Sequence, residues 1–253
     1  MGGGSVMPRF FVENGSILSD TIVIGGEDAK HISLSLRARV GEKITACDGM
    51  GTDYECEISN ITKDEVSLSV LEKMESGAEP SLEVTLYQAL VKSDKFDFIV
   101  QKCTELGVSR IVPVFTDRCI SKPDEKSLAK KIERWNKIAK EAAMQSGRGR
   151  IPVIENAVDY DTALSHMKET DFGFVCYEEN SHEPIDEIYA KSGQIKTASF
   201  LVGPEGGISE KEAEKARNKG VYLAGLGPRI LRTETAPLCV MSVLMLMSGN
   251  MKG

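Results

Sequence analysis

Two glycine-rich stretches carry the residues best suited to hold a ligand. The first is Phe200-Leu-Val-Gly-Pro-Glu-Gly-Gly-Ile-Ser209, in which an apolar strand-like run leads into a glycine-rich turn and then a helix start. Glycines there let the backbone approach a ligand and leave amide N–H groups free to bind it. The spacing matches neither the dinucleotide fingerprint nor the P-loop, and no lysine follows to hold a phosphate. This favours a ligand held through a base and a sugar, with an ordinary tight turn as the alternative.

The second stretch is Gly225-Leu-Gly-Pro-Arg-Ile-Leu-Arg-Thr-Glu-Thr-Ala236. It also follows an apolar run and ends where a helix begins. Arg229 and Arg232 lie close to Glu234 in the sequence, and the alternative to a ligand-binding role is that they are surface arginines paired with that glutamate. Two such turns at the carboxyl ends of two buried strands predict a ligand crevice in an open α/β sheet.

The pattern of the chain changes between two regions. From residue 7 to 74, short β-branched and aromatic runs at 9–12, 21–24, 32–40, 43–46, 54–58 and 66–71 predict a small β-barrel or compact β domain. From 75 to 253, strands at 82–90, 110–115, 172–177, 198–202 and 221–226 alternate with helical patterns, which predicts an α/β sheet with helices on both faces. Residues 1–6 have the composition of a cloning remnant and are left out of this prediction.

Composition excludes several classes of protein. The 253 residues include 31 Lys and Arg against 38 Asp and Glu, a net charge of -7, which excludes a wholly basic nucleic-acid coat. Residues 110–150 nevertheless hold 11 basic and 5 acidic side chains, which favours a polyanion-binding surface over an ordinary solvated helix face. The longest apolar run, Leu238–Met247, is too short to cross a bilayer. The six cysteines include no C-x-x-C pair, so we expect reduced thiols, no metal site and a cytoplasmic protein.

Several motifs together resemble one known family. They are Met7-Pro-Arg-Phe-Phe, Leu90-Val-Lys-Ser-Asp-Lys, Gln101-Lys-Cys-Thr-Glu-Leu-Gly107, the segment 141–148, and both glycine-rich stretches. Their order and spacing resemble the RsmE family of bacterial methyltransferases, which belongs to the SPOUT class, and the resemblance covers the chain after residue 6. Val91 and Ser93 are mild departures from the family pattern.

The resemblance implies a fold, a cofactor and a reaction. The fold is an N-terminal PUA-like β-barrel that binds RNA, over 7–74, followed by a trefoil-knotted SPOUT methyltransferase domain over 75–253. The reaction is transfer of a methyl group from S-adenosylmethionine to N3 of uridine 1498 in 16S ribosomal RNA. The residues that the family motifs imply for the cofactor are Tyr177, Leu201, Gly203, Pro204, Glu205, Gly206, Leu226, Gly227, Ile230, Leu231 and Arg232.

Catalysis would need a cation beside the uracil oxygens and a way to favour deprotonated N3. Arg9 and Arg232 are the candidates for the cation, and Glu234 is a proton acceptor or a clamp for Arg232; RNA binding is the alternative role of both arginines. The candidate RNA contacts are Arg9, Arg37, Arg39, Lys92, Lys95, Arg118, Arg148 and Arg150. The three histidines lie outside every motif. Family members are homodimers that act on the small ribosomal subunit, and the apolar helix 237–247 is a candidate for the interface or for the core.

Two other functions fit part of the pattern. An NAD- or nucleotide-dependent α/β enzyme fits the strand–helix alternation but lacks the dinucleotide fingerprint. A ribosome-assembly protein that binds RNA without catalysis fits the charge distribution, and it would tolerate a change at Gly203 that blocks methyl transfer.

Overall fold

The computed structural model describes residues 7–179 and 183–252, so the predicted cloning remnant lies outside the described residues. The chain forms two units. The first holds residues up to Glu79 together with Ala143–Ile151, and the second holds Pro80–Ala142 and the chain from Pro152 onward. A single boundary at residue 75 therefore does not describe the division, because a short segment far along the chain belongs to the first unit.

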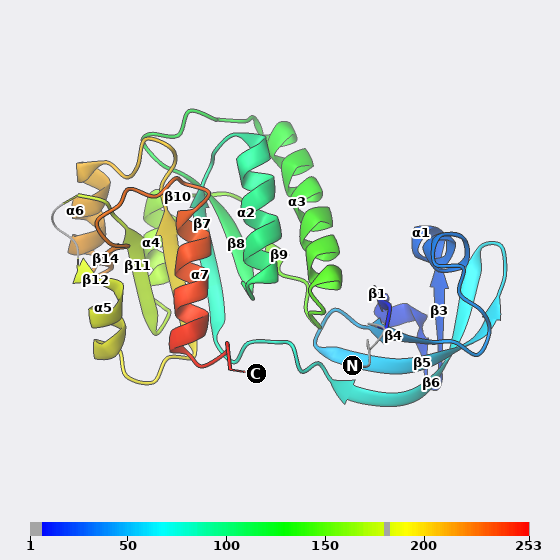
Figure 1. Ribbon diagram of the computed structural model, residues 1–253. Coiled ribbons are helices and arrows are strands. Elements are labelled where there is room, and N and C mark those ends of the chain that lie inside the picture. Colours follow the sequence, from blue (N-terminus) through cyan, green and yellow to red (C-terminus); the bar gives the residue numbers. More distant parts are fainter. Residues whose placement is uncertain (1–6, 180–182, 253) are drawn as a thin grey trace. The chain divides into compact units, whose positions relative to one another are not determined.

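The first unit is built on a sheet of six strands (Figure 1). Their spatial order is β1 (Arg9–Phe11), β4 (Lys43–Cys47), β5 (Thr52–Ile61), β6 (Glu65–Glu75), β3 (Thr21–Gly25) and β2 (Ile17–Leu18). Neighbouring strands are antiparallel except β1 and β4, which are parallel. The predicted strand at 32–40 is wrong. Just before that region lies α1 (Gly26–Lys30), and the region itself begins in a π-helical turn at His31–Ser35; the two bury Ala29 and Ile32 at helical spacing.

Buried charges attach Ala143–Ile151 to the first unit. The Glu79 carboxylate accepts a hydrogen bond from Arg148 Nη2 at 2.8 Å and from the backbone N–H groups of Gly149 and Arg150 at 2.9 and 3.0 Å. The Cys47 thiol donates to the Gly149 carbonyl at 3.2 Å. Arg148 is only 4% exposed, so this loop is held by desolvated, charge-assisted bonds.

The second unit contains a parallel sheet of eight strands among the described residues. Along it lie β10 (Val158–Asp159), β8 (Arg110–Phe115), β7 (Glu83–Ala89), β13 (Thr197–Val202), β11 (Phe172–Cys176), β14 (Tyr222–Gly225) and β12 (Glu183–Pro184), and β9 (Val153–Ile154) pairs with β8. The helices are α2 (Ser93–Glu105), α3 (Glu125–Gln145), α4 (Tyr160–Met167), α5 (Ile185–Lys191), α6 (Glu210–Asn218) and α7 (Ala236–Met247).

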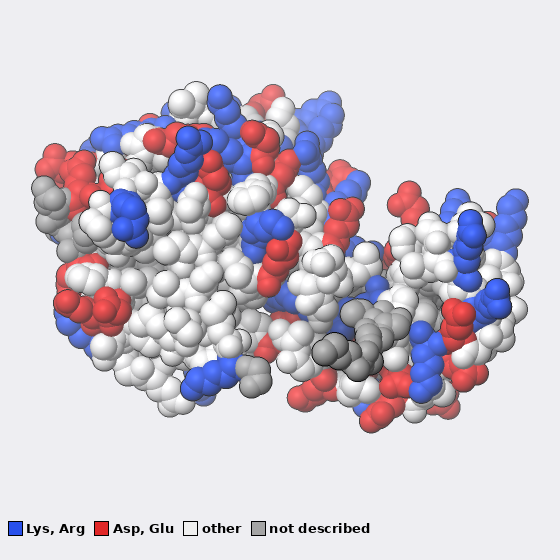
Figure 2. Space-filling model, viewed as in Figure 1, with Lys and Arg blue, Asp and Glu red and all other residues white. Residues whose placement is uncertain are grey.

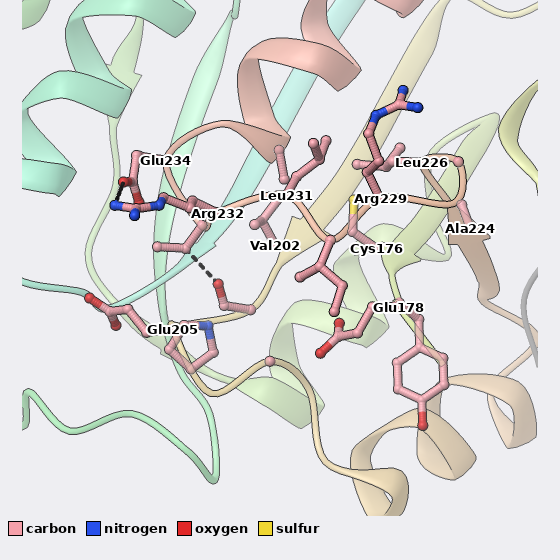
Figure 3. A pocket seen from close by; sticks show the side chains of 18 of the residues that line it. Cys176, Glu178, Val202, Glu205, Ala224, Leu226, Arg229, Leu231, Arg232 and Glu234 are labelled. Atoms are coloured by element: carbon pink, nitrogen blue, oxygen red, sulfur yellow. Dashed lines mark hydrogen bonds and ion pairs between the residues drawn. The ribbon is translucent and has the colours of Figure 1, made fainter. Parts of the chain in front are cut away.

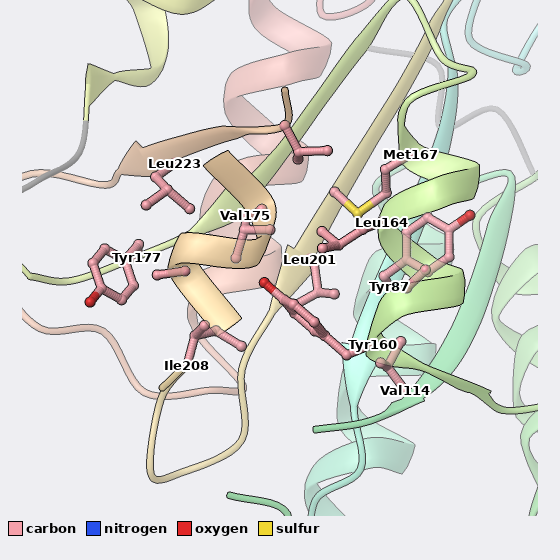
Figure 4. Close-up of a cluster of buried hydrophobic side chains, with 14 of the residues drawn as sticks. Tyr87, Val114, Tyr160, Leu164, Met167, Val175, Tyr177, Leu201, Ile208 and Leu223 are labelled. Atoms are coloured by element: carbon pink, nitrogen blue, oxygen red, sulfur yellow. The ribbon is translucent and has the colours of Figure 1, made fainter. Parts of the chain in front are cut away.

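Helices cover both faces of this sheet, as the sequence predicts. Side chains of α4 and α6 pack with Val175 and Leu201 in one buried cluster (Figure 4). Helices α2 and α7 contact each other and lie in front of the strands in Figure 1. A capping box begins α6, where the sequence predicts a helix start: Ser209 caps the N–H of Glu212, and the Glu212 carboxylate accepts from the Ser209 N–H.

We expect Glu79→Gln to destabilise the first unit. The change leaves the buried Arg148 guanidinium without its carboxylate, and breaking a buried pair of this kind costs about 3 kcal/mol. Hydrogen exchange of the amides in β4, β5 and β6 measures the stability of this unit separately. Glu75→Gln, at an exposed position on β6, is the matched control and should change little. Equal protection in both variants would contradict the structural role of Glu79.

Candidate functional site

Three adjacent parallel strands end at one cavity. Strand β11 lies between β13 and β14, and residues that follow all three strands line a cavity of about 860 Å³. Pro204 from the first glycine-rich turn and Pro228 from the second both line it. The predicted crevice is therefore present, and its volume is in the range of pockets that hold cofactor-sized molecules.

The first turn is shaped by close backbone contacts. A Cβ at Gly203 would lie 3.0 Å from the carbonyl carbon of Gly207 and 3.1 Å from the Ile208 nitrogen, so a side chain there would push the turn open. Gly207 has a φ of +68°, and a Cβ there would overlap with the Glu178 carboxylate. From outside, Arg118 Nη1 donates to the Gly206 carbonyl at 2.7 Å. Both glycines are thus required by the conformation of the turn.

A chain of buried hydrogen bonds links the two turns. Thr233 Oγ1 donates to the Gly203 carbonyl at 2.7 Å, and Gln88 Nε2 donates to Thr233 Oγ1 at 3.2 Å. Gln88 is fully buried and Thr233 is 6% exposed, so water does not compete for these bonds. The end of β7 therefore fixes the second turn against the first.

The outer part of the second turn forms an exposed lip of the cavity. Gly227 has a φ of +94°, which turns the chain after β14. Ile230 is 86% exposed and the Arg232 side chain is 83% exposed, although both line the cavity. These side chains are free to contact a ligand or a second macromolecule without breaking a packed core.

One lysine lies between two carboxylates at the mouth of the cavity. Lys95 Nζ is 3.0 Å from Glu205 Oε1 and 3.7 Å from Glu234 Oε2, and Arg232 Nη1 is 4.0 Å from Glu234 Oε1. Figure 3 shows Glu205, Arg232 and Glu234 on one side of the cavity, and Cys176 and Glu178 on the other. Burial raises the pKa of Glu205, but the Lys95 hydrogen bond and the charges of Lys95 and Lys92 outweigh it and hold the pKa below its ordinary value. Glu234 Oε2 is buried and accepts no hydrogen bond within the described chain.

Comparison with known proteins shows the family to which the chain is related. An RNA methyltransferase domain model matches residues 78–245, and an RNA methyltransferase PUA domain model matches 24–71. Ribosomal RNA small subunit methyltransferase E of Bacillus subtilis is 38% identical over 98% of this chain and 99% of its own. The chain belongs to the ribosomal RNA small subunit methyltransferase E family. The Aquifex aeolicus enzyme of that name is 34% identical over 77% of this chain and 82% of its own.

Solved methyltransferase structures resemble the chain over nearly its whole length. Ribosomal RNA small subunit methyltransferase E of Neisseria gonorrhoeae, determined bound to S-adenosyl methionine, is 33% identical with a TM-score of 0.85 over 95% of this chain and 98% of its own. A putative methyltransferase of Legionella pneumophila, also in complex with this cofactor, is 28% identical with the same TM-score and coverage. The fold is therefore the α/β fold of these methyltransferases with an N-terminal PUA-type domain.

Most residues that the family motifs imply for the cofactor lie at the cavity. Those that line it are Tyr177, Gly203, Pro204, Glu205, Leu226, Gly227, Ile230, Leu231 and Arg232. Leu201 does not: it is fully buried in the core cluster on the face that α4 and α6 cover. Gly206 is not a lining residue either, and its carbonyl faces Arg118.

The candidate RNA contacts fall into three groups. Arg37, Arg39, Lys92 and Arg150 are exposed. Lys95 and Arg118 are engaged at the cavity mouth and at the first turn. Arg148 is buried against Glu79 and Arg9 pairs with Asp53 in the first unit, so Arg148 holds the loop 143–151 and does not present a phosphate-binding surface.

The motif analysis did not single out three residues of the site. Cys176 and Glu178 line the cavity from the end of β11, and Thr233 links the turns. Burial raises the pKa of the Cys176 thiol, which keeps it protonated. Only the position of Cys176 and Glu178 after an apolar strand marks them in the sequence, and that signal is weak. The structure describes no group of three or more His, Cys, Asp or Glu arranged to hold a metal ion.

Replacing Lys95 by Met should raise the pKa of Glu205. The burial that raises it remains, whereas the largest contribution that lowers it is lost. A carboxylate with a lowered pKa adds stability that is present above its ordinary pKa and is lost as the pH falls through the lowered value. The variant should therefore lose this acid-side pH dependence. NMR titration of the Glu205 carboxyl carbon measures the shift.

Lys196→Met is the control, because Lys196 precedes β13 at the opposite end of that strand from Glu205. An unchanged Glu205 pKa in Lys95→Met would show that the ion pair does not form in solution.

Proposed function

We propose that the protein methylates N3 of uridine 1498 in 16S ribosomal RNA. Its family membership makes it an S-adenosylmethionine-dependent rRNA methyltransferase, and the proposal adds the target atom and nucleotide. The observation that carries the proposal is the single cavity lined by both glycine-rich turns, which has no lysine–phosphate clamp of the P-loop type. A cytoplasmic location follows from the proposed substrate.

The residues at the cavity fit the proposed cofactor. Leu226 and Leu231 supply apolar surface, and the glycine-rich turns supply backbone groups, which together suit a neutral, flat adenine. A Cβ at Gly203 would press on the backbone that forms this wall. When bound, the cofactor supplies an electrophilic methyl group on a sulfonium, a good leaving group. The chain's own task is to place the target nucleotide and to favour the anionic base.

We assign those tasks to the charged residues at the mouth. Arg232 is exposed at the cavity, and beside a uracil oxygen its charge would stabilise the negative charge that develops when N3 loses its proton. Glu234 Oε2 is buried and accepts no hydrogen bond within the described chain, which suits Glu234 to accept that proton or to orient Arg232. Arg9 lies in the first unit paired with Asp53, and we propose it as an RNA contact or as a second cation for the base.

We further propose the SPOUT trefoil knot and a homodimer. The knot would bring the second turn, 226–232, against the first. Helix α7 is apolar on its outer side as well as on its buried side: Leu246 is 64% exposed, while Val240 and Leu244 are fully buried. Figure 2 shows an uncharged surface over α7. An outer apolar face of this kind suits a second copy of the chain.

Gly203→Val should abolish methyl transfer, since its side chain would displace the turn that forms one wall of the cavity. Calorimetry should show loss of S-adenosylmethionine binding, while circular dichroism and RNA binding remain close to wild type. Gly203→Ala should weaken methyl transfer and S-adenosylmethionine binding less than Gly203→Val does. Gly77→Val is the control, because a side chain at Gly77 meets open space. Persistent methyl transfer in Gly203→Val would mean that the cofactor binds elsewhere.

Mass spectrometry of 16S rRNA fragments after incubation with labelled cofactor tests the target. We expect one added methyl group, on N3 of uridine 1498. A methyl group on a ribose oxygen, on another base atom or at another nucleotide would refute the assignment. Binding of NAD in place of S-adenosylmethionine, or tight RNA binding with no transfer, would refute the activity as a whole.

A further inference from the structure

The beginning of α3 carries positive charge that the protein itself does not neutralise. Lys126 and Lys130 are four residues apart, so they share one face of the helix, and both are exposed. Neither forms an ion pair within the described residues. Further along the same helix the cations are paired, Arg134 with Asp97 and Lys137 with Glu133. Like charges at this spacing repel, which destabilises the free helix unless an anion from outside binds them.

The acidic residues at the start of α3, Asp124 and Glu125, offset the charge of Lys122, Lys126 and Lys130 only in part. Asp124 accepts the backbone N–H of Ser127 at 2.7 Å and so is used at the start of the helix. Glu125 is the one acidic side chain in the first turn of α3. Lys122, just before the helix, is exposed and adds a further cation. The positive end of the helix dipole lies at the same place.

The contacts between α3 and α2 place these lysines at the edge that holds the cavity. Lys131 Nζ donates to Ser93 Oγ at 3.0 Å, and Trp135 Nε1 donates to Asp97 Oδ1 at 3.1 Å, so the two helices run in the same direction. Ser93 is the first residue of α2, which leaves the part of α3 before Lys131 extending past it by roughly 9 Å. Figure 1 shows both helices beginning at the same end of the unit.

Basic groups continue from α3 to the cavity mouth. Lys92 precedes α2 and is exposed, and its charge helps to lower the pKa of Glu205. Lys95, one turn further, contacts Glu205 and Glu234 directly. In Figure 2, Lys and Arg side chains lie along the upper edge of the second unit, where these helices begin, with Asp and Glu side chains among them. These lysines thus lie at the beginnings of α2 and α3, at the end of the unit that holds the proposed site of methyl transfer.

We infer that Lys92, Lys122, Lys126 and Lys130, here called the α3 basic edge, bind the phosphate backbone of structured RNA next to the target nucleotide. This inference rests on the proposed function. Lysine is a compact point charge on a flexible stem, which suits phosphates better than base edges. Lysine is also depleted in protein–protein interfaces, so an RNA fits this surface better than an acidic protein.

Lys126→Gln with Lys130→Gln should weaken binding of full-length 16S rRNA. Loss of two phosphate contacts should reduce the slope of log affinity against log salt by about 2, and the affinity in 50 mM salt should fall roughly tenfold. The Michaelis constant for RNA should rise while the turnover number stays near wild type. S-adenosylmethionine binding, measured by calorimetry, should not change, which shows that the fold and the cavity are intact.

Lys168→Gln with Lys196→Gln is the matched control. It removes the same charge from exposed positions that precede β11 and β13, at the other end of the sheet from the cavity, and should keep the wild-type slope. Equal salt slopes for all three proteins would overturn the inference and leave the methyltransferase activity standing. A loss of RNA affinity without any wild-type methylation would support the α3 basic edge and refute the proposed function. Weakened binding to the assembled small subunit but not to naked RNA would point to a ribosomal protein and overturn the assignment to RNA.

Discussion

The parallel pairing of β13, β11 and β14 is the constraint on which the site depends. Parallel neighbours must end at the same edge of a sheet, so the segments that follow these strands meet there wherever they stand in the sequence. Pairing alone would leave two loose loops. The buried hydrogen bond from Thr233 to the Gly203 carbonyl converts them into one cavity of defined width. Glycine is required at Gly203, where a side chain would press on the backbone of the turn, and at Gly207, where φ is positive.

Charged and uncharged side chains are distributed unevenly around the cavity. The cavity is lined mainly by glycine, leucine and other uncharged residues, which suits a flat base, with Glu178 on one side and Lys95, Glu205, Arg232 and Glu234 on the other. There Lys95 lies against Glu205 and Glu234, so these carboxylates are held close to a cation even though the chain as a whole has a net charge of -7. A negatively charged RNA approaching the mouth would meet paired carboxylates and the exposed Arg232, and the repulsion is reduced accordingly.

The sequence alone predicts the two turns and the strands before them, because glycine, proline and a capping residue mark the end of a strand and the start of a helix through local sterics. It was insufficient where the answer depends on contacts between distant residues. Leu201 and Val202 both belong to one apolar run, and only the pleat of β13 decides that Val202 lines the cavity while Leu201 enters the core. The sequence alone indicates a free cation at Arg148, because its partner Glu79 lies 69 residues earlier in the chain. The segment 32–40 shows the same limit: its apolar residues fit a strand, but the burial of Ala29 and Ile32 selects a helix.

The net charge of -7 argues against RNA binding, whereas the local excess of basic residues between 110 and 150 favours it. The short range of electrostatic interactions in salt reconciles the two. Screening confines the field of an exposed charge to about 8 Å under physiological salt, so a phosphate responds to the nearest groups and not to the whole molecule. A phosphate at the edge where α2 and α3 begin would therefore respond to the exposed Lys92, Lys126 and Lys130 there, although the chain as a whole is acidic.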